Sequence, residues 1–127
     1  RNIIPGSAYD AISTNYIYSD GKVVNAQDDW TLEGDFGFDM IFRVNFEEGN
    51  LILEKGVLTE NPKDGKGFKP ELSPDLGYYR EIKYFANAVI NDEPIAVATP
   101  ESTMETIKIA EAEYQSAEQQ GALIAIK

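Results

Sequence analysis

The chain has 127 residues, 43% of them hydrophobic and 26% charged, and its 22 acidic and 11 basic side chains give a formal net charge of −11 at pH 7. It contains neither cysteine nor histidine, which excludes a disulfide framework, structural zinc, iron–sulfur clusters, haem held by histidine, and nucleophile systems built on Cys or His. The acidic charge argues against nucleic acid and anionic membrane as partners, and no apolar run approaches the about 20 residues of a membrane span.

The length is that of one domain, so we expect residues 1–127 to fold as a single domain. The chain begins with Arg1 rather than Met, which indicates a processed or excised piece without a signal peptide. The absence of cysteine is compatible with the cytoplasm, where we expect the protein to reside.

The first half of the chain is typical of β-strands. Residues 11–19 are rich in β-branched and aromatic side chains, Asp20-Gly21 follows, and a second such run covers 22–30. Two β runs joined by Asp-Gly predict a hairpin with a type I′ turn, because that turn needs positive φ at both central residues.

A further series of strands follows a glycine-containing break at 34–37. Residues 38–47 alternate strictly, which predicts one strand with an apolar face made of Phe38, Met40, Phe42, Val44 and Phe46. A turn at 48–50 leads into 51–54, and Gly56 separates a short strand at 57–59. Residues 61–74 contain three prolines and two glycines and predict a long loop.

Two helices are predicted in the second half. Ser73 or Asp75 can cap the first, which ends at 91–94 and carries one apolar stripe of Tyr78, Ile82, Phe85 and Val89. The second begins with Thr99 as N-cap and Pro100 at the first helical position, and Gly121 suits its C′ position. Residues 122–126 predict a final strand.

This order of elements predicts an α+β fold, in which two helices cover one face of an open, mainly antiparallel sheet. The other face is expected to be half apolar rather than polar, because it carries Ile17, Ile41, Ile52 and Ile124. A solvated sheet face normally alternates to polar residues. We therefore expect another domain or a second subunit to cover it, as in a homodimer or higher homo-oligomer.

No spacing in the chain predicts a catalytic residue, a cofactor-binding residue or a metal ligand. Asp28 and Asp29 are adjacent in a predicted strand and would point to opposite faces, and the pair Glu47 and Glu48 falls in a turn. The segment 65–67 (Gly-Lys-Gly) lacks the strand before it and the helix after it that a phosphate loop requires.

Aromatic side chains are the candidates for ligand contact. Trp30 ends a predicted strand and can line a pocket or anchor a core or an interface. Tyr78 and Tyr79 follow the long loop at the start of a helix, where a tyrosine hydroxyl can bond a sugar or polyol or simply reach the surface from the core. We select Tyr78 and Trp30 as predicted substrate-binding residues.

A resemblance adds to this interpretation. Tyr78-x-x-Glu81-Ile82-x-x-Phe85 leads to Pro94, Thr99-Pro100-Glu101 opens a helix, and Ala112-x-x-x-Ser116-Ala117-x-x-x-Gly121 ends it. Together with Tyr16-x-x-x-Asp20-Gly21, Trp30 and Phe46-x-x-Gly49-x-Leu51, this order resembles the C-terminal portion of the Gfo/Idh/MocA family (glucose–fructose oxidoreductase, inositol dehydrogenase, rhizopine catabolism). The resemblance covers about residues 10–127.

The resemblance implies a parent enzyme of the NAD- or NADP-dependent oxidoreductase class that acts on sugars or cyclic polyols. It implies an upstream Rossmann domain, an open sheet that forms the dimer face, and a substrate site between the domains. Tyr78 matches a position near the family's substrate pocket.

The chain departs from the family pattern where the chemistry lies. It lacks the Gly-rich dinucleotide loop, the Glu-Lys-Pro motif with its catalytic lysine, and the Asp-x-x-x-His pair. We therefore expect no catalytic or cofactor residue in this chain, and no activity from it alone. Two alternatives stay open: a stand-alone ligand-binding or protein-interaction module that self-associates through its sheet, and a hydrolase built on paired carboxylates.

Overall fold

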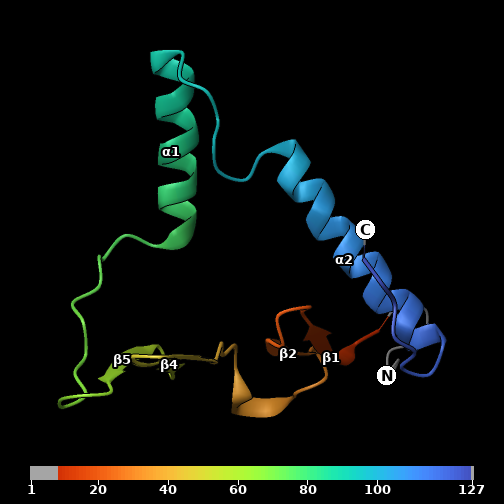
Figure 1. Cartoon of the computed structure of the whole chain (residues 1–127). Helices are drawn as coiled ribbons and strands as arrows, with labels where there is room; N and C mark the ends of the chain where they lie inside the picture. The colour runs from red at the N-terminus through yellow and green to blue at the C-terminus, as the bar shows by residue number, and fades with distance from the viewer. Residues whose placement is uncertain (1–8, 127) are drawn as a thin grey trace. The chain divides into compact units, whose positions relative to one another are not determined.

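The computed structural model describes residues 9–126 and divides the chain into two compact units, 1–73 and 74–127 (Figure 1). In the first unit, β1 (Ala11–Ile17) pairs with β2 (Val23–Asp29). The 3-10 helix η1 spans Gly34–Phe36. A second sheet consists of β3 (Phe42–Phe46), β4 (Gly49–Glu54) and β5 (Val57–Pro62). The second unit holds α1 (Gly77–Asn91) and α2 (Pro100–Glu118). Antiparallel strands in open sheets and two helices confirm the α+β class.

The expectation of one continuous sheet is corrected, because the strands pair as two sheets in the orders β1-β2 and β3-β4-β5. The face that the helices cover, and the single-domain organisation, stay predictions.

The β1–β2 hairpin forms at the predicted Asp-Gly, but its turn is of another type. Ile17 pairs with Val23, the Tyr18 N–H donates to the Lys22 carbonyl at 2.9 Å, and the Gly21 N–H donates to the Tyr18 carbonyl at 3.0 Å. Gly21 has φ 87°, whereas Asp20 is not among the residues with positive φ. The loop therefore has three residues with glycine in the left-handed position, and the type I′ prediction was wrong.

Asp20 has a lowered pKa because the Lys22 ammonium and the Lys22 backbone N–H both donate to its carboxylate, at 2.6 and 3.1 Å. A depressed carboxyl pKa stabilises the folded hairpin above the unfolded-state value of 3.8 and loses this effect as the pH falls through the folded-state value. We expect Lys22→Ala to raise the Asp20 pKa toward 3.8 in a carbon-detected NMR titration. An unchanged Asp20 titration in that variant would contradict the assignment.

The three-stranded sheet is held by two tight turns. Glu47 and Glu48 connect β3 to β4, one residue earlier than predicted, so that Gly49 already pairs with Phe46. Lys55 and Gly56 connect β4 to β5 with φ values of 50° and 72°. Positive φ at both positions is the signature of a type I′ turn, so this turn lies here rather than at Asp20-Gly21.

The strand predicted over 38–47 is shorter in the structure, where β3 begins at Phe42. Phe42 pairs with Leu53, so the residue before it would face Glu54, the last residue of β4. Residues 38–40 therefore continue the alternating pattern beyond the end of β4 and have no residue of that strand opposite them. The predicted apolar residues Phe38, Met40 and Ile41 remain exposed there.

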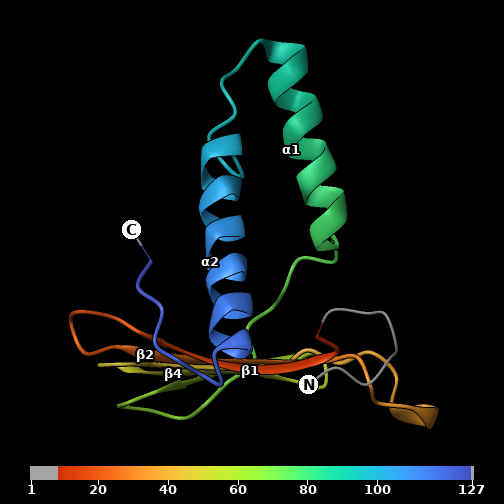
Figure 2. The ribbon, with the colours of Figure 1, turned by 90° about the vertical axis from the view of Figure 1, so that its right-hand side faces the viewer.

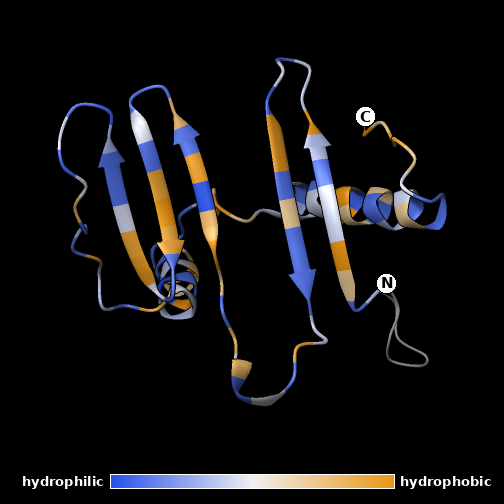
Figure 3. Cartoon of the chain, turned by 90° about the horizontal axis from the view of Figure 1, so that it is seen from below, coloured by the Kyte–Doolittle hydropathy of each residue, from blue (hydrophilic) through white to orange (hydrophobic). Residues whose placement is uncertain are grey.

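Strand pairing gives each sheet one apolar and one polar face, and Figure 3 shows hydrophilic and hydrophobic residues alternating along the strands. On the three-stranded sheet, Phe42, Val44 and Phe46 share a face with Leu51, Leu53 and Leu58. On the hairpin, Ile12, Tyr16 and Val24 share a face. Of the isoleucines expected on the other faces, Ile17 lies there opposite Val23, and Ile52 lies there between Arg43 and Thr59. Ile41 and Ile124 lie outside any strand.

Helix α1 begins at Gly77 with Leu76 as N-cap and without a side-chain cap, so the prediction of Ser73 or Asp75 was wrong. It ends as predicted, because Asp92 takes the left-handed conformation at the C-cap. The segment that follows is hydrogen bonded to the helix through Tyr84. The Tyr84 hydroxyl oxygen accepts hydrogen bonds from the backbone N–H groups of Ala96 and Val97 at 2.8 and 3.1 Å.

The Tyr84 side of α1 is therefore covered by its own chain, and Ala88 on that side is one of two buried residues in the part of the chain that the structure describes; the other is Asp10. The predicted apolar stripe lies about a quarter of a turn away from Ala88. Its members Tyr78, Ile82, Phe85 and Val89 are all exposed in the described unit. The stripe is thus an apolar surface that α1 does not bury within its own unit.

Helix α2 begins as predicted, with Pro100 in its first turn and the Thr99 hydroxyl oxygen accepting the Ser102 N–H at 3.2 Å. At its end, the N–H groups of Gln120 and Gly121 donate to the Ala117 and Ser116 carbonyls at 3.2 and 2.8 Å. This pair of bonds is a Schellman motif. The C′ residue of this motif is Gln120, with φ 58°, one position before the predicted Gly121, which also has a positive φ of 87°.

The cap at Thr99 is testable by substitution. We expect Thr99→Ala to destabilise α2 by about 1 kcal/mol, because the Ser102 N–H loses its acceptor at the start of the helix. Circular dichroism during urea unfolding measures the loss, and Thr99→Ser, which keeps the hydroxyl, serves as the control. Equal stabilities for the two variants would contradict the role of the cap.

The final strand predicted at 122–126 is absent: these residues turn back beside the last turns of α2 (Figures 1 and 2). The Ser116 hydroxyl donates to the Ala122 carbonyl at 2.8 Å and fixes the start of this segment. Across residues 9–126, neither helix is long and apolar enough to cross a membrane.

Candidate functional site

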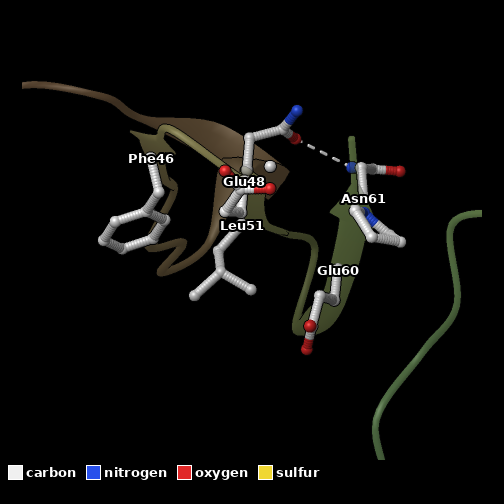
Figure 4. Close-up of a pocket in the computed structure, with 8 residues that line it drawn as sticks. Phe46, Glu48, Leu51, Glu60 and Asn61 are labelled. Atoms are coloured by element: carbon white, nitrogen blue, oxygen red, sulfur yellow. Dashed lines mark hydrogen bonds between the residues drawn. The ribbon is translucent and has the colours of Figure 1, made fainter. Parts of the chain in front are cut away.

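A shallow hollow of about 290 Å³ lies at the β3–β4 turn end of the three-stranded sheet (Figure 4). Its lining comes from both faces of the sheet and consists of Phe46, Glu48, Gly49, Asn50, Leu51, Glu60, Asn61 and Pro62. Phe46, Leu51 and Glu60 belong to the apolar face of the sheet, whereas Asn50 and Asn61 belong to its polar face, so the lining side chains point to two sides.

Backbone contacts hold the walls of this hollow. The Lys63 N–H donates to the Glu48 carbonyl at 2.8 Å, which closes β5 against the β3–β4 turn. Glu60 and Phe68 exchange two backbone hydrogen bonds of 2.9 Å, so the predicted loop at 61–74 folds back on β5 instead of leaving the sheet. Gly49 lets the strands approach, because a Cβ there would collide with the Asn61 carbonyl oxygen.

The polar groups of the hollow are hydrogen-bond donors and acceptors on two faces of the sheet. The Asn61 side-chain amide donates to the Asn50 side-chain oxygen at 2.9 Å, and this orients both side chains (Figure 4). Carboxylates accept hydrogen bonds and amides both donate and accept, whereas an aromatic ring packs against an apolar ligand face. Within residues 9–126, no group of three or more Asp and Glu side chains is arranged to hold a metal ion.

Trp30, one of the two predicted substrate-binding residues, does not line this hollow. Its backbone N–H donates to the Asp10 carbonyl at 2.8 Å, and its indole N–H donates to the Asp28 carboxylate at 2.8 Å. The ring is thereby held at the end of β2 with 71% of its surface exposed. This gives an oriented, open aromatic platform, and its role in substrate binding stays a prediction.

Tyr78, the other predicted substrate-binding residue, lies in the second unit, in the first turn of α1, where it is 81% exposed. The neighbouring Tyr79 ring stands 5.5 Å from the Lys83 ammonium, a cation–π distance. Tyr78 is therefore accessible to a ligand or to another surface, and its substrate role also stays a prediction.

The acidic pairs form no acid–base dyad. Asp28 and Asp29 point to opposite faces of β2, as expected, because Asp28 faces Ile12 and Asp29 faces Ala11. The Asp29 carboxylate accepts hydrogen bonds from the backbone N–H and the hydroxyl of Thr31 at 2.8 and 2.6 Å. The other pair, at 47 and 48, is exposed in its turn. One pair lies on the hairpin and the other on the three-stranded sheet, so the arrangement gives no support to the carboxylate hydrolase.

The sequence interpretation missed the residues of the hollow. Asn50 and Asn61 stand directly opposite each other on neighbouring strands, but this becomes visible only once the β4–β5 register is known. The sequence did not reveal this pair, because Asn50 was predicted to lie in a turn and Asn61 in a loop. Comparison of the chain with protein-family models, with curated proteins and with solved structures finds no match.

Proposed function

We infer that this chain is the C-terminal substrate-pocket and dimerisation domain of a cytoplasmic NAD- or NADP-dependent oxidoreductase that acts on a sugar or cyclic polyol. The parent protein supplies an upstream Rossmann domain with the cofactor site and the catalytic lysine. The chain alone contributes pocket residues and a self-association surface, and it is inactive as an isolated fragment.

The observation that carries this proposal is the exposure of large apolar side chains in both units. Phe38 and Tyr78 are each 81% exposed and Phe46 is 60% exposed. Large apolar side chains exposed in this number support contact with another domain or subunit. The alternating pattern of 38–46 and the stripe of α1 both fit such contact, and so does the order of motifs, which resembles that of the family.

The hollow and the exposed rings support the class of substrate. Phe46 and Glu60, on the same face of the sheet, offer an apolar surface and a hydrogen-bond acceptor, and the paired amides of Asn50 and Asn61 on the other face both donate and accept. Sugars and cyclic polyols present this combination of hydroxyls and apolar ring faces. Their neutral character also suits a chain of net charge −11, which repels sugar phosphates.

The proposal is tested on the native polypeptide, captured from its source cells with an antibody to this domain. We expect a band roughly two to three times the size of 127 residues, the increment of one or two further domains. The captured protein should reduce NAD⁺ or NADP⁺ with at least one member of a panel of aldoses and cyclic polyols. A larger polypeptide that binds neither nucleotide would contradict the proposal.

The hollow also favours the second candidate function, a stand-alone ligand-binding or interaction module, because its walls come from one unit only. A native band at the size of 127 residues, without nucleotide binding, would favour the stand-alone module over the oxidoreductase domain. Titration calorimetry of the isolated chain with the same sugars and polyols would then separate a binding module from a protein-interaction module.

A further inference from the structure

The chain contains two Asp-Gly pairs, Asp20-Gly21 and Asp64-Gly65, and no Asn-Gly pair. An aspartate before glycine is the one most open to attack by the chain's own backbone, because glycine has no Cβ to hinder the approach of its nitrogen to the carboxyl carbon. Both pairs lie in exposed loops of the first unit. The two sites therefore share the same local sequence, and only the fold distinguishes the surroundings of their reacting atoms.

At Asp20 both reacting groups are engaged. The Gly21 N–H donates to the Tyr18 carbonyl at 3.0 Å, so the attacking nitrogen is held inside the turn. The Asp20 carboxylate accepts hydrogen bonds from the Lys22 ammonium at 2.6 Å and from the Lys22 backbone N–H at 3.1 Å. These bonds favour the ionised carboxylate, which resists attack by a nucleophile because it offers no leaving hydroxyl. The hairpin thus protects Asp20.

At Asp64 neither reacting group is engaged. Within residues 9–126, the Asp64 carboxylate has no hydrogen-bond or ion-pair partner, and the Gly65 N–H has no acceptor. Both residues are exposed. Gly65 has φ 146°, a conformation that residues with a Cβ rarely adopt, so the nitrogen lies in a stretch of backbone that only glycine readily forms. The attacking nitrogen and the carboxyl carbon are therefore free to approach each other.

We propose that Asp64 is a site of isoaspartate formation in the folded protein and that Asp20 is protected from the same reaction. The Gly65 nitrogen attacks Cγ of the protonated Asp64 carboxyl, a C–N bond forms, and the carboxyl hydroxyl leaves with the amide proton as water. Water then opens the resulting succinimide ring. Opening at Cγ restores aspartate, whereas opening at the backbone carbonyl carbon leaves isoaspartate, in which the main chain runs through Cβ and Cγ. One water leaves and one enters, so the mass of the chain is unchanged.

The modification would change the loop beside the hollow. Isoaspartate lengthens the main chain by one methylene and leaves a free α-carboxylate as a branch. The added length falls between two anchors of the loop, the Lys63 N–H on the β3–β4 turn and the paired backbone bonds of Phe68 with Glu60. A Cβ on Gly67 would collide with the Asn61 side-chain oxygen, so the loop packs closely along β5. Modification of Asp64 therefore alters a segment that borders the hollow, independently of the proposed function.

The test is storage of the full chain at mildly acidic pH, folded in one sample and unfolded in guanidinium chloride in another. Fragmentation mass spectrometry of proteolytic peptides locates isoaspartate, and enzymatic methylation of its α-carboxylate by S-adenosylmethionine measures the amount. In the folded chain we expect isoaspartate to accumulate at least about tenfold faster at Asp64 than at Asp20. In the unfolded chain the two rates should agree within about threefold, because both sites are then unprotected Asp-Gly pairs.

Two variants assign the signal to its causes. Asp64→Glu keeps the charge but requires a larger ring, so methylation of the stored, folded chain should fall by about tenfold. Lys22→Ala removes the ammonium from Asp20 and should raise the rate there by at least about threefold, with the Asp64 rate unchanged. Equal rates at the two sites in the folded chain, or methylation that Asp64→Glu leaves unchanged, would overturn the proposal. Neither result bears on the proposed function, which does not involve this reaction.

Discussion

Substitution of Gly49 by alanine is expected to destabilise the first unit by at least about 3 kcal/mol. Gly49 has φ 151°, a conformation that residues with a Cβ rarely adopt, and a Cβ there would collide with the Asn61 carbonyl oxygen. Both obstacles lie in the backbone, so neither can be relieved by a side-chain rotation. Urea unfolding followed by the fluorescence of Trp30, the single tryptophan, measures the effect in this unit.

Two other glycines serve as controls for Gly49. Gly56 also has positive φ, 72°, but nothing lies within 4 Å of the place that a Cβ would take, so Gly56→Ala should cost only about 1 kcal/mol. Gly77 has neither a positive φ nor a neighbour at that distance, and Gly77→Ala in the first turn of α1 should be neutral or slightly stabilising. A Gly49→Ala variant no less stable than Gly56→Ala would contradict the close approach of β4 and β5.

Removal of the Tyr84 hydroxyl is expected to have the second largest effect, a loss of about 2 kcal/mol in the second unit. In Tyr84→Phe, the backbone N–H groups of Ala96 and Val97 both lose their acceptor. The segment after α1 would then detach from the helix and uncover Ala88. Circular dichroism in urea measures the stability, and amide hydrogen exchange at Ala96 and Val97 reports the local release.

Tyr79→Phe is the matched control for Tyr84→Phe. It removes a hydroxyl from the same helix but keeps the ring that faces the Lys83 ammonium. We expect its stability to stay within about 0.5 kcal/mol of the unchanged chain. Equal losses in the two variants would contradict the specific role of Tyr84.

The sequence predicted an element well where a short run of residues strongly favours one local structure, such as a turn or a helix start. Asp20-Gly21 located the first hairpin, and Thr99-Pro100 located the start of α2. The details of each turn depend on the strands beside it. The three-residue loop at Gly21 and the type I′ turn at Lys55-Gly56 follow from the pairing registers, which the sequence does not state.

Strand lengths could not be predicted because a strand needs a partner. The alternating pattern covers residues 38–47, but β3 begins only at Phe42. The neighbouring strand β4 ends at Glu54, and the chain turns at Lys55. Residues 122–126 have the composition of a strand, and in the structure they turn back beside α2 instead. Pairing partners are a tertiary property, and they override the local preference for β structure.

The candidate site illustrates the same limit. Trp30 and Tyr78 stand out in the sequence because aromatic residues are conspicuous, and both prove to be exposed. The amides of Asn50 and Asn61 do not stand out, because only the β4–β5 register brings them together.

Equilibrium sedimentation of the 127-residue chain at tens of micromolar tests most directly whether this chain presents a surface for its own copy. We expect a mass of twice the monomer, or a higher multiple, with a concentration-dependent equilibrium that persists at moderate salt because the contact is uncharged. A single species at the monomer mass over the whole concentration range would contradict the account.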